Sequence, residues 1–117
     1  MAGSAFAAVE LHGVSYVVKV LCDKLGSRES EILQQEMATL VKQHGYRMAL
    51  DCSGVTLIAS MGLGMFIQIN KDCRGHAGKF VIFGLNGELM KLLAMTKLEK
   101  VLSVAPDRAA ALKVLAG

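Results

Sequence analysis

Hydrophobic positions along the chain follow two periods, and segments with the two periods alternate from one end to the other. Short runs rich in Val, Ile, Leu and Phe show the alternating or continuous apolar pattern of β-strands. In the second run, Tyr16, Val18 and Val20 fall on one face. The sequence His-Gly-Val at 12–14 separates the first two runs and predicts a β-hairpin. The predicted strands cover residues 6–11, 15–21, 47–52, 80–83 and 101–104.

Between these runs, apolar residues recur at the spacing of amphipathic helices. The first helix begins at Ser27 or Ser30, either of which can act as an N-cap, and it ends before Gly45. The second helix begins at Ser60 and continues to about Arg74. The predicted apolar stripes are Leu33, Met37, Leu40 and Val41 in the first helix and Met61, Met65, Phe66 and Ile69 in the second.

Two shorter helices complete the pattern. Asn86 is the N-cap of one, with Glu88 in its first turn, and Pro106 stands near the first position of the last, which continues through Leu115. A hairpin followed by alternating helices and strands is typical of an α/β fold. We expect a mixed, mostly parallel β-sheet of about five strands with about four helices packed on it, in a single domain over residues 1–117.

Composition narrows the functional class. The 117 residues are 53% hydrophobic, which suffices for a core without disulfides or metal. Thirteen Lys and Arg against ten Asp and Glu are scattered along the sequence, and the aromatic residues are only four Phe and two Tyr. We therefore expect no nucleic-acid partner. Three cysteines without a CxxC pair indicate a reduced compartment. The apolar stretch at 55–69 is short for a membrane span, and residues 1–10 lack the basic segment of a signal peptide, so we expect a cytoplasmic protein without a transmembrane segment.

The most informative segment is 50–64, Leu-Asp-Cys-Ser-Gly-Val-Thr-Leu-Ile-Ala-Ser-Met-Gly-Leu-Gly. A strand ends there, a short loop follows, and Ser60 falls at the predicted N-cap of a helix. Ligands and partners bind at the carboxyl ends of strands in open α/β sheets. Serine is also among the best N-cap residues, so capping alone accounts for Ser60 on the basis of spacing.

The same segment resembles the STAS domain family, named for sulfate transporters and anti-sigma factor antagonists. Two further segments look like the family's later strand, helix and turn, residues 78–86 and 92–98. The resemblance extends from about residue 6 to the end of the chain. The positions within 50–64 that match the family pattern are Asp51, Ser53, Gly54, Val55, Ile58, Ser60, Gly62, Leu63 and Gly64.

The resemblance implies a protein-interaction switch of the anti-sigma factor antagonist type. In that family a partner serine kinase phosphorylates the serine that corresponds to Ser60. The partner implied here is a serine kinase/anti-sigma factor of the histidine-kinase-like ATPase fold. We expect no enzymatic activity, no cofactor and no metal, and a monomer whose exposed edge strand would allow weak dimers. The expected partner-binding residues are Asp23, Lys24, Ala59, Ser60, Met61, Gly62, Leu63 and Gly64.

Four departures from the family pattern leave a second hypothesis open. Ala59 replaces the acid before the serine, Met61 replaces the next hydroxyl residue, and Lys97 replaces a turn glycine. In the family's Gly-x-Leu, only Leu25 matches. The alternative is a STAS subunit of a lipid transporter or signalling scaffold that is not phosphorylated. A small enzyme is a third possibility, for which the sequence names no substrate.

Three weaker signals point elsewhere. The pair Gly62-x-Gly64 would be half of a dinucleotide-binding fingerprint, but Ile67 stands where the third glycine belongs. Asp51 ends a strand as in a receiver domain, but the acidic pair that would hold Mg²⁺ is missing, and we expect a turn hydrogen bond instead. The motif Cys73-x-x-His76 is only half of a metal site.

Overall fold

The computed structural model of the chain describes residues 6–12, 15–43 and 45–116. Its main sheet has five strands in the spatial order β1–β2–β4–β6–β7. β1 pairs antiparallel with β2, and the other neighbours are parallel. β3 and β5 form a separate two-stranded parallel ladder. The strands are β1 (Ala7–His12), β2 (Ser15–Val20), β3 (Lys24–Leu25), β4 (Arg47–Asp51), β5 (Leu57–Ile58), β6 (Lys79–Phe83) and β7 (Ser103–Ala105).

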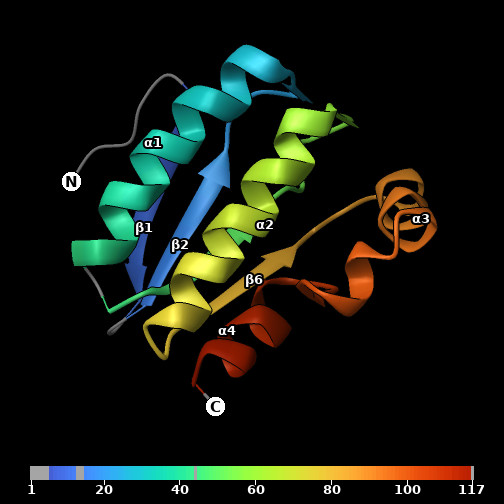
Figure 1. Cartoon of the computed structure of the whole chain (residues 1–117). Coiled ribbons are helices and arrows are strands. Elements are labelled where there is room, and N and C mark those ends of the chain that lie inside the picture. The colour runs from blue at the N-terminus through green and yellow to red at the C-terminus, as the bar shows by residue number, and fades with distance from the viewer. Residues whose placement is uncertain (1–5, 13–14, 44, 117) are drawn as a thin grey trace.

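Helices cover both faces of this sheet. α1 and α2 lie side by side over one face, and α4 packs on β4, β6 and β7 from the other (Figure 1). The expected α/β fold with a mixed, mostly parallel five-stranded sheet is therefore confirmed. The helices in the described part of the chain are α1 (Ser27–Gln43), α2 (Ser60–Gly75), α3 (Gly87–Met95) and α4 (Arg108–Ala116), with a 3-10 turn, η1 (Leu98–Lys100).

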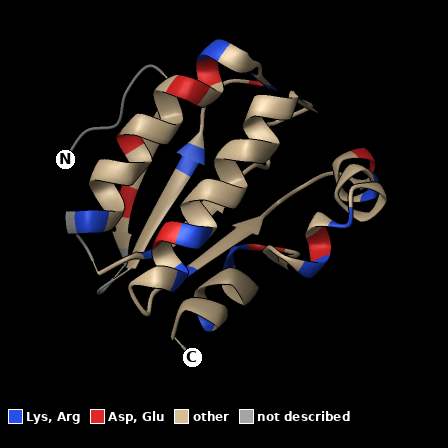
Figure 2. Ribbon diagram, viewed as in Figure 1, with Lys and Arg blue, Asp and Glu red and all other residues tan. Residues whose placement is uncertain are grey.

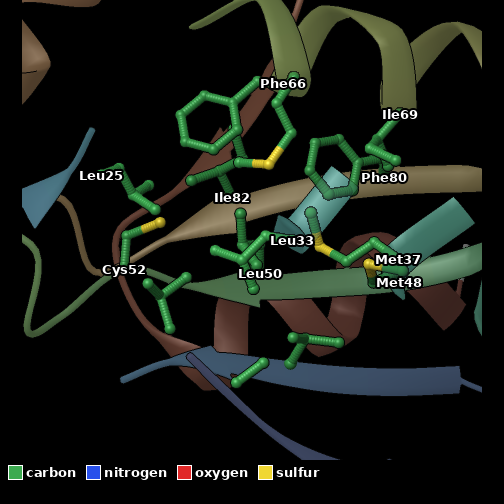
Figure 3. Close-up of a cluster of buried hydrophobic side chains, with 14 of the residues drawn as sticks. Leu25, Leu33, Met37, Met48, Leu50, Cys52, Phe66, Ile69, Phe80 and Ile82 are labelled. Atoms are coloured by element: carbon green, nitrogen blue, oxygen red, sulfur yellow. The ribbon is translucent and has the colours of Figure 1, made fainter. Parts of the chain in front are cut away.

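The alternation of strand side chains divides the interior into two clusters. In β2, Val18 belongs to the larger cluster under α1 and α2, whereas Val17 belongs to the smaller one under α4. Figure 3 shows part of the larger cluster, where Leu50 and Ile82 of the sheet lie among side chains of the helices such as Phe66. Both faces of the central strands are buried, as continuous apolar runs predict.

The starts of the first and last helices differ from the sequence prediction. α1 begins at Ser27, and the backbone carbonyl of Gly26 accepts the first intrahelical bond from the N–H of Ser30 (3.0 Å), so Gly26 holds the N-cap position. Ser30 lies buried within the first turn and is not a cap. The last helix starts at Arg108, two residues after Pro106, which was predicted near its first position.

The remaining differences concern ends of elements. Asp107 caps α4, because its Oδ1 accepts the backbone N–H of Ala110 at 2.9 Å. The predicted edge strand at 101–104 is the three-residue β7, shifted toward the C-terminus. Asn86 caps α3 as predicted, with its Oδ1 2.8 Å from the backbone nitrogen of Leu89. The hairpin pairing of β1 and β2 is confirmed, and the glycine of its turn lies outside the described residues.

Candidate functional site

Ser60 is the first residue of α2 and is exposed. The sequence placed Ser60 at the N-cap, but the structure gives that position to Ala59, whose backbone is extended (φ −78°, ψ 168°). The carbonyl of Ala59 accepts the backbone N–H groups of Gly62 (2.9 Å) and Leu63 (3.2 Å). The backbone N–H of Ala59 donates to the carbonyl of Leu25 at 2.8 Å. The contact with β3 therefore fixes where α2 begins, in place of the capping preference of serine.

The backbone N–H groups at the N-terminus of α2 have no capping side chain. The N-cap residue makes no side-chain hydrogen bond, and the first turn contains no acidic residue. The first N–H groups of a helix lack intrahelical partners, and the helix dipole places about half a positive elementary charge there. The start of α2 therefore favours a negatively charged group beside Ser60.

The ladder of β3 and β5 brings Asp23 and Lys24 to the segment that leads into α2. Lys24 pairs with Leu57 and Leu25 pairs with Ile58 in this ladder. The carbonyl of Asp23 accepts both the backbone N–H (2.6 Å) and the hydroxyl (3.1 Å) of Thr56. Two segments about 33 residues apart in the sequence are thus held side by side, with Asp23 and Lys24 exposed.

The eight expected partner-binding residues differ in how far they reach the surface. Asp23, Lys24, Ser60, Met61 and Gly64 are exposed, Ala59 and Leu63 are half-buried, and Gly62 is buried.

Gly62 lies where α2 packs closely on its neighbours. A Cβ atom at Gly62 would stand 2.7 Å from Cγ2 of Ile58 and 3.2 Å from Oγ of Ser30 in α1. The role that the structure shows for Gly62 is close packing. Met61, which the helical period placed in the core stripe, is instead 46% exposed.

Sequence reasoning missed Leu57 as part of this surface. Leu57 is 50% exposed and stands beside Lys24 on the outer face of the ladder, while Leu25 and Ile58 face inward. Leu57 lies within the apolar stretch at 55–69, where nothing in the pattern distinguishes it from core residues. A two-residue strand leaves too short a pattern for the sequence to reveal which of its side chains faces outward.

Asp51 has the structural role predicted for it. Its Oδ1 accepts the backbone N–H of Ser53 at 2.9 Å within the turn that follows β4. Cys52 is fully buried directly after it, and burial raises the pKa of that thiol above its ordinary value.

Among the residues that the structure describes, the half metal motif gains no further ligand. Cys73 is buried, and its burial raises the thiol pKa to about 12. The ring of His76 stacks on Tyr46 with 3.9 Å between centroids, and its Nδ1 lies 2.9 Å from the carbonyl oxygen of Asp72. The described residues contain no group of three or more His, Cys, Asp or Glu side chains suited to a metal ion. None of the helices among them is long and apolar enough to cross a membrane.

Comparison with known proteins places this site in a family. The model of the STAS domain matches residues 24–111, which include the β3–β5 ladder and all of α2. The anti-sigma-B factor antagonist of Listeria monocytogenes is 29% identical over 62 residues, which cover 53% of this chain and 54% of that protein. The chain thus spans about half the length of the curated relatives it matches.

Solved structures share the whole fold. The anti-sigma factor antagonist from Mycobacterium paratuberculosis superposes with a TM-score of 0.83 at 21% identity, over 95% of this chain and 93% of that one. The Bacillus cell fate determinant SpoIIAA in its phosphorylated form gives 0.70 at 14% identity, over 92% and 98% of the two chains. With the family match over most of its length and the same architecture throughout, this chain belongs to the STAS domain family.

Proposed function

We propose that this domain is a protein-interaction switch of the anti-sigma factor antagonist type, regulated by phosphorylation of Ser60. Its partner is a serine kinase/anti-sigma factor of the histidine-kinase-like ATPase fold. The observation that carries the proposal is the exposure of Ser60 at a helix start that has neither an acidic residue in its first turn nor a side-chain cap. The names of the Listeria and Mycobacterium proteins and the phosphorylated form of SpoIIAA support it.

The switch follows from electrostatics at one helix end. A phosphoryl group adds about −1.5 to −2 charges at neutral pH. In the free domain, the N–H groups and dipole of α2 stabilise this charge, so the fold is retained. Between two closely packed protein surfaces, the same charge loses its hydration, and the complex dissociates. The domain acts in the cytoplasm as a binding module without a catalytic step of its own.

The exposed residues on the elements around Ser60 form the proposed partner surface. Asp23 and Lys24 supply charge, and Met61 with Leu57 supplies apolar area. Gly64 is exposed with nothing within 4 Å of the position its Cβ would take, which leaves room for the backbone of a partner to approach.

The experiment compares three serine variants for binding to the kinase that copurifies with the wild-type domain. Ser60→Ala is expected to keep the partner and Ser60→Asp to lose it, while Ser103→Asp on the exposed edge strand β7 adds the same charge elsewhere and is expected to bind normally. Incubation with the kinase and ATP should add one phosphoryl group to the wild type and none to Ser60→Ala. Equal affinity of Ser60→Ala and Ser60→Asp would refute the switch.

Ala59 favours one alternative function. With alanine at the N-cap in place of the family's acid, a kinase that reads the acid would not recognise this site. The domain would then be a STAS subunit of a lipid transporter or signalling scaffold. Copurification with a transporter ATPase, unchanged by Ser60→Asp and without any phosphoryl mass on the chain, would support this alternative.

A further inference from the structure

The fold gathers positive charge at the pole opposite Ser60. The strands β2, β4 and β6 begin at this pole, and α1, α2 and α4 end there (Figure 1). Figure 2 shows Lys and Arg at the lower ends of these helices and at the starts of the strands. We name this surface the basic pole and define it by Lys42, Arg47, Lys71, Arg74, Lys79 and Lys113.

The formal charge of the basic pole and that of the rest of the chain have opposite signs. Six Lys and Arg and one acid, Asp72, give the basic pole a formal charge of +5. The other seven Lys and Arg and nine Asp and Glu give the rest of the chain −2, which together make the formal +3 of the whole. The charges are scattered in the sequence, and only the fold brings them together.

The helix ends account for part of this charge. Lys42 and Lys113 lie in the last turns of α1 and α4, where a cation offsets the helix dipole. Arg47 and Lys79 donate hydrogen bonds to the carbonyl oxygens of Leu115 and Val114 at the end of α4. Three helix C-termini carry about half a negative elementary charge each, so they leave most of the +5 uncompensated.

The side chains at the basic pole fit a surface of headgroups and acyl chains. Lys42, Lys71 and Lys113 are exposed. Val114, whose carbonyl bonds Lys79, is 38% exposed, and Leu11, next to the last residue of β1, is 58% exposed. Cations that border exposed apolar side chains are the pattern of proteins that bind anionic membrane surfaces.

We propose that the basic pole binds the surface of an anionic lipid bilayer and leaves Ser60 facing away from it. α2 connects the two sites, and its 16 residues separate them by about 24 Å. A bilayer is favoured over a nucleic acid because the charges spread over the ends of three helices and two strands instead of following a groove, and because apolar residues accompany them. The proposal is independent of phosphorylation at Ser60.

The test is cosedimentation with vesicles of phosphatidylglycerol and phosphatidylcholine. Wild type is expected to bind vesicles rich in phosphatidylglycerol, to leave pure phosphatidylcholine vesicles unbound, and to dissociate as salt rises. Each lysine near an anionic surface contributes about a fivefold change in partitioning, so Lys42→Gln with Lys71→Gln should weaken binding about 25-fold.

A charge-matched variant shows whether vesicle binding depends on the charge of the basic pole or on the overall charge of the protein. Lys91→Gln with Lys100→Gln removes the same two charges from α3 and η1, away from the basic pole, and is expected to bind vesicles nearly as well as wild type. Circular dichroism and thermal unfolding confirm that both double variants are folded. Ser60→Asp is expected to leave vesicle binding unchanged.

Three outcomes would overturn the proposal. One is binding to pure phosphatidylcholine vesicles as strong as to anionic ones. Another is an equal loss of binding in the two double variants, because overall charge would then explain the result. The third is duplex DNA that competes with the vesicles and depends on Lys42 and Lys71 in the same way, which would assign the basic pole to nucleic acid.

Discussion

Two glycines of α2, Gly62 and Gly64, have the same neighbours in sequence but opposite surroundings in the structure. Alanine stabilises a helix interior by about 1 kcal/mol over glycine, so propensity favours both Gly→Ala changes. At Gly64, which is exposed, an ideal Cβ meets nothing within 4 Å. Gly64→Ala should therefore raise the free energy of unfolding by about 0.5–1 kcal/mol.

At Gly62 the steric cost exceeds this gain. The Cβ of an alanine would lie 2.7 Å from Cγ2 of Ile58, which branches directly from that residue's Cβ and cannot swing away freely, and 3.2 Å from Oγ of the buried Ser30. Overpacking of this kind costs about 1–3 kcal/mol, so after the propensity gain we expect Gly62→Ala to lower the free energy of unfolding by up to about 2 kcal/mol.

Urea unfolding of the wild type and the two variants measures the difference. The midpoints should move in opposite directions at constant m-value, with about 1–3 kcal/mol between the variants. A Gly62→Ala protein as stable as Gly64→Ala would refute the close packing of Gly62 against Ile58 and Ser30. Because Gly64 lies on the proposed partner surface, Gly64→Ala should also weaken partner binding while it stabilises the domain. The effect of Gly64 on stability can then be distinguished from its effect on binding.

Three further predictions concern single residues. Asn86→Ala removes the side-chain oxygen that accepts a backbone N–H at 2.8 Å, and calorimetry should show a loss of about 1 kcal/mol. Lys97 has a left-handed backbone (φ 61°), so Lys97→Gly should stabilise the domain by about 0.5–1 kcal/mol in urea unfolding, and destabilisation would contradict this geometry. Burial raises the pKa of the Cys73 thiol to about 12 and also raises that of Cys52. At pH 8 both thiols are therefore protonated, and both are buried away from the reagent. Iodoacetamide should modify the half-buried Cys22 first and the other two cysteines only on unfolding.

The sequence was sufficient for the order of the helices and of the strands of the main sheet, and for most of the core, because burial on one or both faces imposes a period that short windows reveal. It was less informative at helix starts. Ala59 and Gly26 hold N-cap positions that propensity assigned to serines, because tertiary contacts outweigh capping preferences of about 1 kcal/mol. The bond from Ala59 to Leu25 belongs to the β3–β5 ladder, which joins segments distant in sequence.

The same limit applies to the surface around Ser60. The motif within 50–64 marked the position of Ser60, but exposure of Leu57 and Met61 and burial of Gly62 depend on how the ladder and α1 pack against α2. At Lys97 the structure agrees with the family pattern where the sequence departs from it. The missing glycine looked like a departure from the family, yet the backbone there keeps the left-handed conformation that glycine favours.

The shift of the helix start by one residue changes what Ser60 can do. A serine at the N-cap would use its oxygen to accept a backbone N–H, and modification would remove that cap from the fold. As the first residue within α2, Ser60 leaves the N-cap position to Ala59, which has no side-chain oxygen to lose. A phosphoryl group at Ser60 would therefore add an anion to a helix end that lacks one and remove no capping bond. Phosphorylation of Ser60 should then leave the free energy of unfolding unchanged or raise it. If the Ser60→Asp variant instead had a clearly lower free energy of unfolding than the wild type, the hydroxyl would have a structural role.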